Sequence, residues 1–217
     1  MTAPLIQRFV LSDLLTNGYL VYDPDSSDAV MIDPGGSVEP VSAFLRRHGL
    51  TLRAILNTHG HADHIMGNVR LRETTGAPIG IHALDVPYLS DPVLNAAAFF
   101  QWPFVPHKPD FLLADGGMAG GGTLKFEVLH TPGHTPGSCC LVSREHGIVF
   151  GGDLVFEGGV GRWDVPGGDP DALMASLRKF ARLPGECTVY PGHGNATTVA
   201  REVASNPYIL QALAAGG

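Results

Sequence analysis

The chain is organised around one short polar stretch, Thr58-His59-Gly60-His61-Ala62-Asp63-His64. Three imidazoles and one carboxylate fall within it, and both groups are common ligands for divalent metals in proteins. The preceding residues 51–57 predict a buried strand, and the residues from 65 onward predict the start of a helix. Because a strand-to-helix turn aims loop side chains from rigid elements, the H-x-H-x-D-H spacing favours a metal site over a histidine-rich surface loop.

Three further polar side chains follow strand-like runs at turns that glycine or proline forces. His134 lies in T-P-G-H-T-P-G, Asp153 follows I-V-F-G-G, and His193 lies in P-G-H-G. Strand ends at one edge of a sheet can converge in space although they are far apart in sequence. We therefore expect one site with enough donors for two metal ions, formed by His59, His61, Asp63, His64, His134, Asp153 and His193.

The order of these motifs resembles the metallo-β-lactamase superfamily over nearly the whole chain, beginning at Asn17-Gly18-Tyr19 and Ile32-Asp33-Pro34-Gly35-Gly36. Periodicity alone predicts α/β or α+β, and the resemblance implies an αββα sandwich with a single domain over residues 1–217. It also implies two divalent ions, with zinc expected first and iron or manganese as alternatives. In this reading the first ion is held by His59, His61 and His134, the second by Asp63, His64 and His193, and Asp153 bridges the two.

Such a site predicts hydrolysis. Two divalent ions about 3.5–4 Å apart lower the pKa of a shared water towards roughly 7, which makes hydroxide available at neutral pH. A thiolate leaves with little protonation, so the site suits a thioester. Asp153 stands where the main class B β-lactamases carry cysteine, and residues 158–164 resemble the G-R-x-D stretch of glyoxalase II-like proteins. The resemblance therefore implies a hydrolase of a hydroxyacyl-glutathione, with Asp63 and Asp153 as catalytic carboxylates.

The strongest alternative is an iron-dependent persulfide dioxygenase, which shares the G-R-x-D stretch and would use His59, His134 and Asp153. Its usual motif around the last histidine, P-A-H-D-Y, differs from P-G-H-G-N here. A non-enzymatic binding module explains a complete open metal site poorly. The net charge of −7 argues against a nuclease or any nucleic-acid partner.

Composition predicts a globular chain, because 44% of its residues are hydrophobic and 16% are charged. The partner that the resemblance implies is a small-molecule thioester. The first eight residues lack signal-peptide character, no apolar run is long enough for a bilayer, and the three cysteines suit reduced thiols. We therefore expect a cytoplasmic protein without a membrane partner. Full-length glyoxalase II adds a basic C-terminal helical region, whereas the last basic residue here is Arg201, so we expect weak glutathione recognition.

Several local features allow two interpretations. The apolar stretch Ala96–Val105 predicts a cover over the active site or a homodimer contact. Asp33 either orients a metal ligand or simply ends a turn. We predict helices over residues 37–48, capped by Ser37, over 169–183 and over 197–211, and a loop over 115–122. The remaining histidines are expected to be structural or at the surface: His48, His82, His107, His130 and His146.

Overall fold

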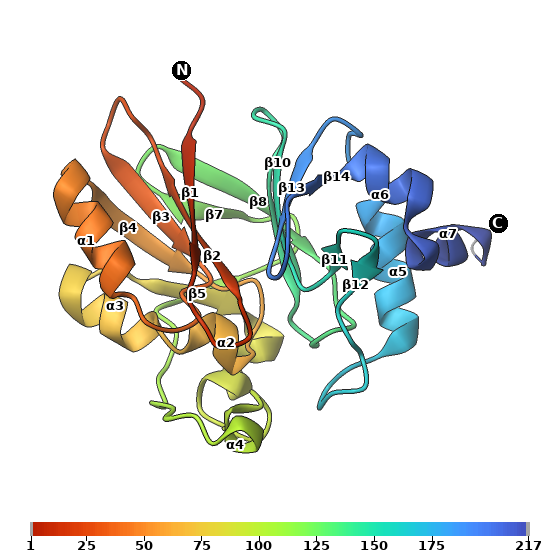
Figure 1. The fold of residues 1–217 in the computed structure, drawn as a ribbon, viewed down its shortest axis with the longest axis horizontal. Helices are drawn as coiled ribbons and strands as arrows, with labels where there is room; N and C mark the ends of the chain where they lie inside the picture. Colours follow the sequence, from red (N-terminus) through yellow and green to blue (C-terminus); the bar gives the residue numbers. More distant parts are fainter. Residues whose placement is uncertain (1, 216–217) are drawn as a thin grey trace.

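The structure is a computed structural model that describes residues 2–215. Two six-stranded sheets pack face to face between two layers of helices (Figure 1). The first sheet has the order β1 (Leu5–Val10), β2 (Asn17–Tyr22), β3 (Asp28–Ile32), β4 (Thr51–Leu56), β5 (Ile79–His82) and β6 (Phe111–Leu113). The second has the order β14 (Thr197–Thr198), β13 (Thr188–Pro191), β10 (Ile148–Gly152), β9 (Cys139–Ser143), β8 (Leu124–His130) and β7 (Met118–Gly121).

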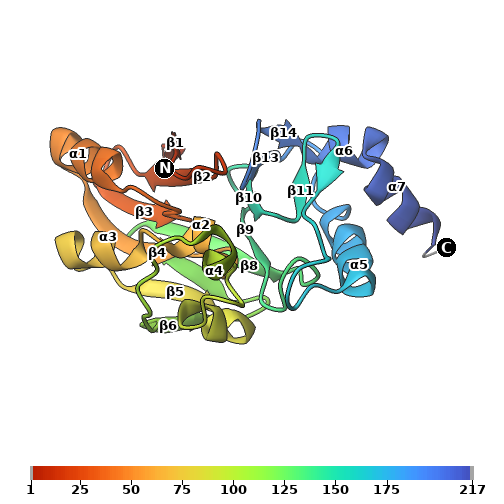
Figure 2. The ribbon, with the colours of Figure 1, turned by 60° about the horizontal axis from the view of Figure 1, so that its bottom comes forward.

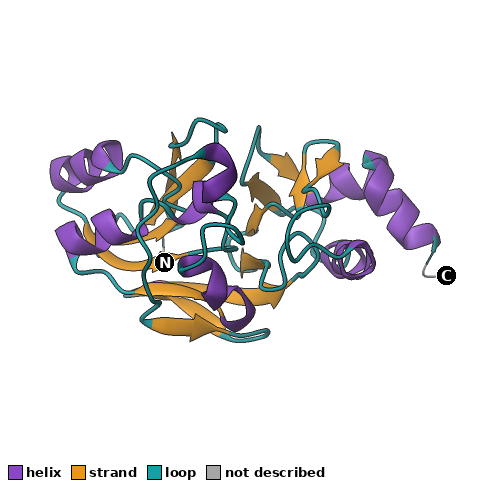
Figure 3. Ribbon diagram, turned by 90° about the horizontal axis from the view of Figure 1, so that it is seen from below, coloured by secondary structure: helices purple, strands orange, loops and turns teal. Residues whose placement is uncertain are grey.

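Helices cover the outer face of each sheet, which Figures 1 and 3 show from two sides. Helices α1 (Glu39–His48) and α3 (Asn68–Thr75) lie on the first sheet, and α5 (Pro170–Phe180), α6 (Val199–Ser205) and α7 (Pro207–Ala214) lie on the second. The short helices α2 (Ala62–Ile65) and α4 (Ala97–Phe100), a 3₁₀ helix (Ala83–Leu89) and the hairpin of β11 (Val155–Phe156) and β12 (Gly159–Val160) lie in the connections. The expected αββα sandwich is confirmed.

Strands β2, β3, β9 and β10 are buried on both faces, because the opposite sheet packs on one side and helices pack on the other. In β2, Tyr19 and Val21 point into the core between the sheets, whereas Leu20 packs under the helices. In β9, Cys139 points into the same central core and Cys140 packs under α5. The described cysteines are free and buried, as predicted for small core residues.

Three local predictions are wrong, each for a visible physical reason. Helix α1 begins at Glu39, and Ser37 donates a 2.8 Å hydrogen bond to that side chain instead of capping the helix. The glycine-rich segment predicted as a loop contains β7, because pairing with β8 satisfies its backbone. The helix predicted over 197–211 is a short strand and two helices, broken where Asn206 precedes Pro207.

The carboxyl ends of several strands meet at one end of the sandwich. Strands β3, β4 and β5 run parallel to one another in the first sheet, and β10 runs parallel to β13 in the second. The loops that follow them therefore lie side by side, and the polar residues of the sequence motifs gather there. Figure 2 brings this end of the molecule forward, with α2 and α4 beside it. Among residues 2–215, no helix has the length and apolar character needed to cross a bilayer.

Candidate metal centre

His59, His61 and His134 form the first group of converging donors. Their candidate ligand atoms lie within 4.8 Å of one another. His61 Nδ1 lies 2.8 Å from His134 Nε2, which is the approach expected when two imidazole lone pairs are aimed at one ion. Burial lowers the pKa of His59 and His61, and the neighbouring imidazoles lower it further. Both rings are therefore neutral, which is the form that binds metals.

Asp63, His64 and His193 form the second group, also within 4.8 Å. Asp63 Oδ2 lies 3.3 Å from His193 Nε2 and 3.5 Å from His64 Nε2. Burial alone would raise the pKa of Asp63, but the His64 imidazole and hydrogen bonds from His193 and Thr16 lower it. The carboxylate is therefore ionised at neutral pH.

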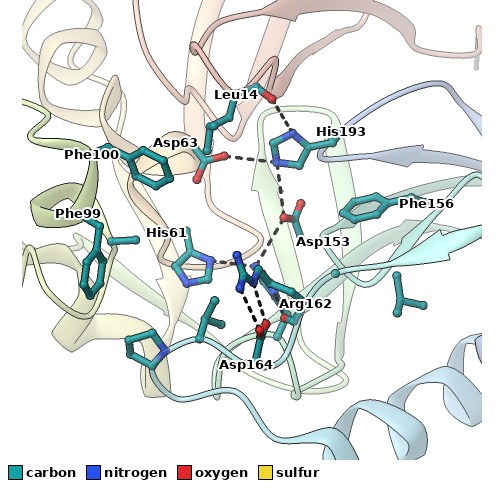
Figure 4. Close-up of a pocket in the computed structure, with 16 residues that line it drawn as sticks. Leu14, His61, Asp63, Phe99, Phe100, Asp153, Phe156, Arg162, Asp164 and His193 are labelled. Atoms are coloured by element: carbon teal, nitrogen blue, oxygen red, sulfur yellow. Dashed lines mark hydrogen bonds and ion pairs between the residues drawn. The ribbon is translucent and has the colours of Figure 1, made fainter.

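Asp153 lies between the two groups. Its Oδ2 is 3.5 Å from both His134 Nε2 and His193 Nε2, and its Oδ1 is 3.4 Å from His64 Nε2 (Figure 4). One carboxylate thus faces donors from both groups. This is the arrangement that a bridging ligand requires.

Backbone and hydroxyl acceptors orient the rings so that the remaining nitrogens face inward. The Nδ1–H of His134 donates to the Arg162 carbonyl at 2.6 Å, and that of His193 donates to the Leu14 carbonyl at 3.1 Å. His59 Nδ1 lies 3.1 Å from the Thr58 hydroxyl. A hydrogen bond on one ring nitrogen fixes the tautomer and leaves Nε2 with a lone pair.

Asp33 orients His64, as one of the two sequence interpretations predicts. Its Oδ2 accepts from His64 Nδ1 at 3.0 Å and from the Thr58 hydroxyl at 2.6 Å, while Oδ1 accepts from the Thr58 amide at 2.8 Å. Asp33, His59 and His64 also meet the geometric test for a third donor group. Since these hydrogen bonds occupy both Asp33 oxygens, we assign it to orientation.

The donor set fits metal ions. Among the described residues, His59 Nε2, His64 Nε2 and Asp153 Oδ1 are buried polar atoms of the donor groups without a hydrogen-bond partner, and so is His61 Nε2, on the far side of the ring whose Nδ1 faces His134. Such atoms are costly unless something binds them. Burial should lower the pKa of His64, but the carboxylates of Asp63, Asp153 and Asp33 raise it to about 10. The second group thus has a strongly negative potential, which a bound cation would neutralise.

Two glycines allow the donors to approach so closely. Gly152, which precedes Asp153, has φ of +49°, and a Cβ there would collide with Thr58 Oγ1. A Cβ on Gly192, which precedes His193, would collide with Asp153 Oδ1. The register between β10 and β13 shifts just before Asp153, and such irregularities re-aim side chains next to sites. The G-G-D and P-G-H motifs therefore have a steric origin.

The sequence analysis missed two residues that support the centre. The Thr16 hydroxyl donates to Asp63 Oδ2 at 2.7 Å. Asp85, fully buried, accepts from the Gly60 amide, the Thr135 hydroxyl and the Gly137 amide at 2.6–2.8 Å. Asp85 follows β5 at the same sheet edge as the motifs, so its position after a buried strand was a usable signal. The sequence offered no comparable signal for Thr16.

A cavity of about 600 Å³ opens onto the donors His61, Asp63, His134, Asp153 and His193. Ala96, Phe99 and Phe100 also line it, so the expected cover at Ala96–Val105 contributes to the site. Arg162 and Asp164, in the G-R-x-D stretch, form an ion pair with two hydrogen bonds of 2.8 and 2.9 Å. The volume is typical of a small-molecule site.

Comparison with known proteins places this architecture in a family. The family model described as the metallo-beta-lactamase superfamily matches residues 11–193. This chain belongs to the metallo-beta-lactamase superfamily. The sandwich described above is accordingly the metallo-beta-lactamase fold, and its His and Asp cluster is suited to divalent metals.

Two curated relatives are similar over most of their length and are named hydrolases. The probable metallo-hydrolase YqgX of Bacillus subtilis is 34% identical over 94% of this chain and 96% of its own length. The hydroxyacylglutathione hydrolase GloC of Haemophilus influenzae is 35% identical over 89% of this chain and 92% of its own. The relatives of this chain at this level of identity thus include proteins named as hydrolases.

Three solved structures have the same fold. The BLEG-1 B3 metallo-beta-lactamase has a TM-score of 0.90 at 38% identity, covering 94% of this chain and 99% of its own. TTHA1623 in a di-iron-bound form has a TM-score of 0.84 at 39% identity, and the match covers 93% of this chain and 99% of TTHA1623. ETHE1 from Myxococcus xanthus has a TM-score of 0.75 at 31% identity, and the match covers 94% of this chain and 83% of ETHE1.

Proposed function

We propose that the protein is a metal-dependent hydrolase that cleaves a thioester of the hydroxyacyl-glutathione type. The position of Asp153 between the two donor groups carries the proposal, because it joins them into one two-metal centre. In this centre His59, His61 and His134 would hold one ion, Asp63, His64 and His193 would hold the other, and Asp153 would be available to both. Zinc is the first choice of metal, with iron or manganese as alternatives.

Bound metal would supply charge that lowers the pKa of water and polarises a carbonyl. Asp63 and Asp153 are the proposed catalytic carboxylates, because both line the cavity. Ionised Asp63, held by Thr16, can accept a hydrogen bond from a water molecule that enters and so orient it. In the overall reaction a C–O bond to water forms, the C–S bond breaks, and a carboxylic acid and a thiol are released without any change in oxidation state.

The comparisons support this reaction class through the names of GloC and YqgX. The acidic residue at position 153 and the Arg162–Asp164 pair also fit the glyoxalase II-like pattern of the sequence. The alternative is a persulfide dioxygenase using one iron on His59, His134 and Asp153. It is retained because Asp153 Oδ2 lies 3.5 Å from His134 Nε2, so these donors could act without the second group.

Oxygen consumption distinguishes the two reactions. The metal-loaded protein is given lactoyl-glutathione, a simple acyl thioester, or glutathione persulfide, while thiol release and dissolved oxygen are recorded together. A β-lactam is included because BLEG-1 is named a metallo-beta-lactamase. We expect thiol release at constant oxygen. Oxygen uptake with the persulfide and no reaction with any thioester would replace this proposal with the dioxygenase.

A further inference from the structure

The mouth of the cavity is apolar on both sides. Leu14, Phe99 and Phe100 line one side, and Phe156 lies opposite them (Figure 4). Phe99 is 66% exposed and Phe100 is 48% exposed. Large apolar side chains exposed together beside polar donors are typical of surfaces that bind apolar ligands.

These phenylalanines are held in place. The ring of Phe100 stacks on Trp102 with centroids 4.5 Å apart and an interplanar angle of 17°. Ala96 and Gln101, which flank α4, both have positive φ, at 68° and 55°. Non-glycine residues seldom adopt positive φ and keep it only where the surrounding structure enforces it. The backbone therefore turns sharply on either side of the two exposed rings.

The segment that carries Phe99 and Phe100 is hydrogen-bonded, through Asn95, to the loop that carries Asp63. The Asn95 carbonyl accepts from the Ala62 amide at 2.8 Å, next to Asp63. The Asn95 side chain, fully buried, donates to the Tyr88 carbonyl at 2.8 Å and accepts from the Ala97 amide at 3.0 Å. The apolar rim is thus fixed relative to the donors, as a substrate-positioning surface must be.

Away from the metal-binding donors, the cavity has few cationic side chains that could bind a charged substrate. Among the described residues that line it, Arg162 is the one arginine or lysine. Its guanidinium forms two hydrogen bonds with the Asp164 carboxylate, at 2.8 and 2.9 Å. Glutathione has two carboxylates, and binding either of them through Arg162 would require breaking this pair.

We propose that the apolar rim binds the hydrocarbon chain of an acyl thioester, and that the thiol part needs no charged group. This inference rests on the proposed hydrolase function and names the substrate class of the same site. Phe99 and Phe100 are its specificity-determining residues. The chain length of the acyl group then governs binding, while glutathione is interchangeable with a smaller neutral thiol.

A series of thioesters of N-acetylcysteamine with acetyl, butyryl, hexanoyl and octanoyl groups tests the rim. We expect kcat/KM to rise by up to about fourfold for each added methylene, the fold-change that corresponds to about 0.8 kcal/mol. The Phe99→Ala and Phe100→Ala variants should reduce the rise to below about twofold per methylene. Leu112→Ala removes a 58% exposed leucine that does not line the cavity and should keep the wild-type slope.

The thiol part is tested by comparing hexanoyl-glutathione with hexanoyl-N-acetylcysteamine. We expect kcat/KM values within about threefold of each other, because the one arginine that lines the cavity is already paired with Asp164 and is not free to bind the glutathione carboxylates. A preference above tenfold for the glutathione thioester would overturn the inference. The inference would also be overturned if kcat/KM did not change with acyl chain length. The same holds if Phe99→Ala and Phe100→Ala kept the chain-length dependence of the wild type.

A binding measurement separates failure of the inference from failure of the proposed function. S-alkyl thioethers of N-acetylcysteamine cannot be hydrolysed, and Trp102 reports their binding through its contact with Phe100. Trp163→Phe makes Trp102 the sole tryptophan, since the chain has two. If no thioester is cleaved but affinity for thioethers rises with chain length, the hydrolase proposal fails and the apolar site stands. If thioesters are cleaved but thioether affinity does not depend on length, the apolar site fails alone.

Discussion

Asp85 joins the two loops that carry the histidine donors. Its Oδ2 accepts from Gly60, between His59 and His61, and its Oδ1 accepts from Gly137, in the loop of His134. Burial raises the pKa of this carboxyl even though three donors contact it. The residue has no direct part in the reaction, but it fixes the separation of the two loops.

Replacing Asp85 by alanine should weaken both the fold and the metal centre. Buried donors left without an acceptor cost about 1–3 kcal/mol each, so we expect unfolding free energy to fall by roughly 3 kcal/mol. Loss of such supporting contacts typically lowers metal affinity about 10–100-fold. Urea denaturation and competition with a chelator measure the two effects. Asp171→Ala, an exposed carboxylate on α5, is the control, and equal metal affinity in both variants would refute the role.

At the scale of single residues, the sequence identified donors better than it identified their supports. His134 and His193 were visible because T-P-G-H and P-G-H place them at glycine turns after strands. The role of the Thr16 hydroxyl could not be predicted from the sequence, because its hydrogen bond to Asp63 joins residues 47 positions apart. No local pattern marks a threonine as a hydrogen-bond partner of so distant a carboxylate.

Strands β5 and β8 belong to different sheets, and two histidines stack where these strands end. The rings of His82 and His130 have centroids 4.1 Å apart and an interplanar angle of 11°. Burial lowers the pKa of His82, and the His130 imidazole lowers it further. Protonating both rings at once would place like charges in contact.

This stack predicts a pH dependence of stability. The pKa of His82 in the folded protein lies below its unfolded value of about 6.5. At pH values between these two pKa values, the unfolded chain therefore binds more protons than the folded chain. The contribution of neutral His82 to folding stability is therefore fully present above pH 6.5 and is lost as the pH falls below that value. Urea denaturation between pH 7.5 and 5 should show a shallower loss for His82→Phe, which keeps an aromatic ring against His130. His48→Phe, at the exposed end of α1, controls for removing a histidine, and identical slopes in all three proteins would contradict the prediction.

At the scale of elements, strand positions were predictable and several boundaries were not. The runs that became β9 and β10 are apolar because both of their faces are buried, whereas β4 and β8 alternate apolar residues with exposed polar ones. Strand β7 was missed because Met118-Ala119-Gly120-Gly121 has low strand propensity, and its pairing with β8 is a tertiary effect. The break at Asn206-Pro207 was visible in the sequence, since proline disfavours helix in the residue before it.

The whole molecule brings donors from both halves of the chain to one end of the sandwich. The connection after β4 of the first sheet supplies His59, His61, Asp63 and His64, and the connections after β8, β10 and β13 of the second supply His134, Asp153 and His193. The Asn17 amide donates to the Gly192 carbonyl at 2.7 Å, which ties the first sheet to the loop of His193. The sequence predicted this convergence from motif order and strand ends. The apolar rim required the structure, because which side chains of Ala96–Val105 face the cavity depends on the turns at Ala96 and Gln101.

Metal content per chain tests most directly whether the two donor groups form one two-metal centre. Wild type, Asp153→Ala and Asp171→Ala are loaded with metal under the same conditions, checked for folding by circular dichroism, and analysed for metal and thioester hydrolysis. We expect close to two ions per chain in wild type and in Asp171→Ala. In Asp153→Ala we expect one ion or fewer and no activity, because the carboxylate between the groups is gone. A single ion in wild type, or two ions with full activity in Asp153→Ala, would contradict the two-metal centre.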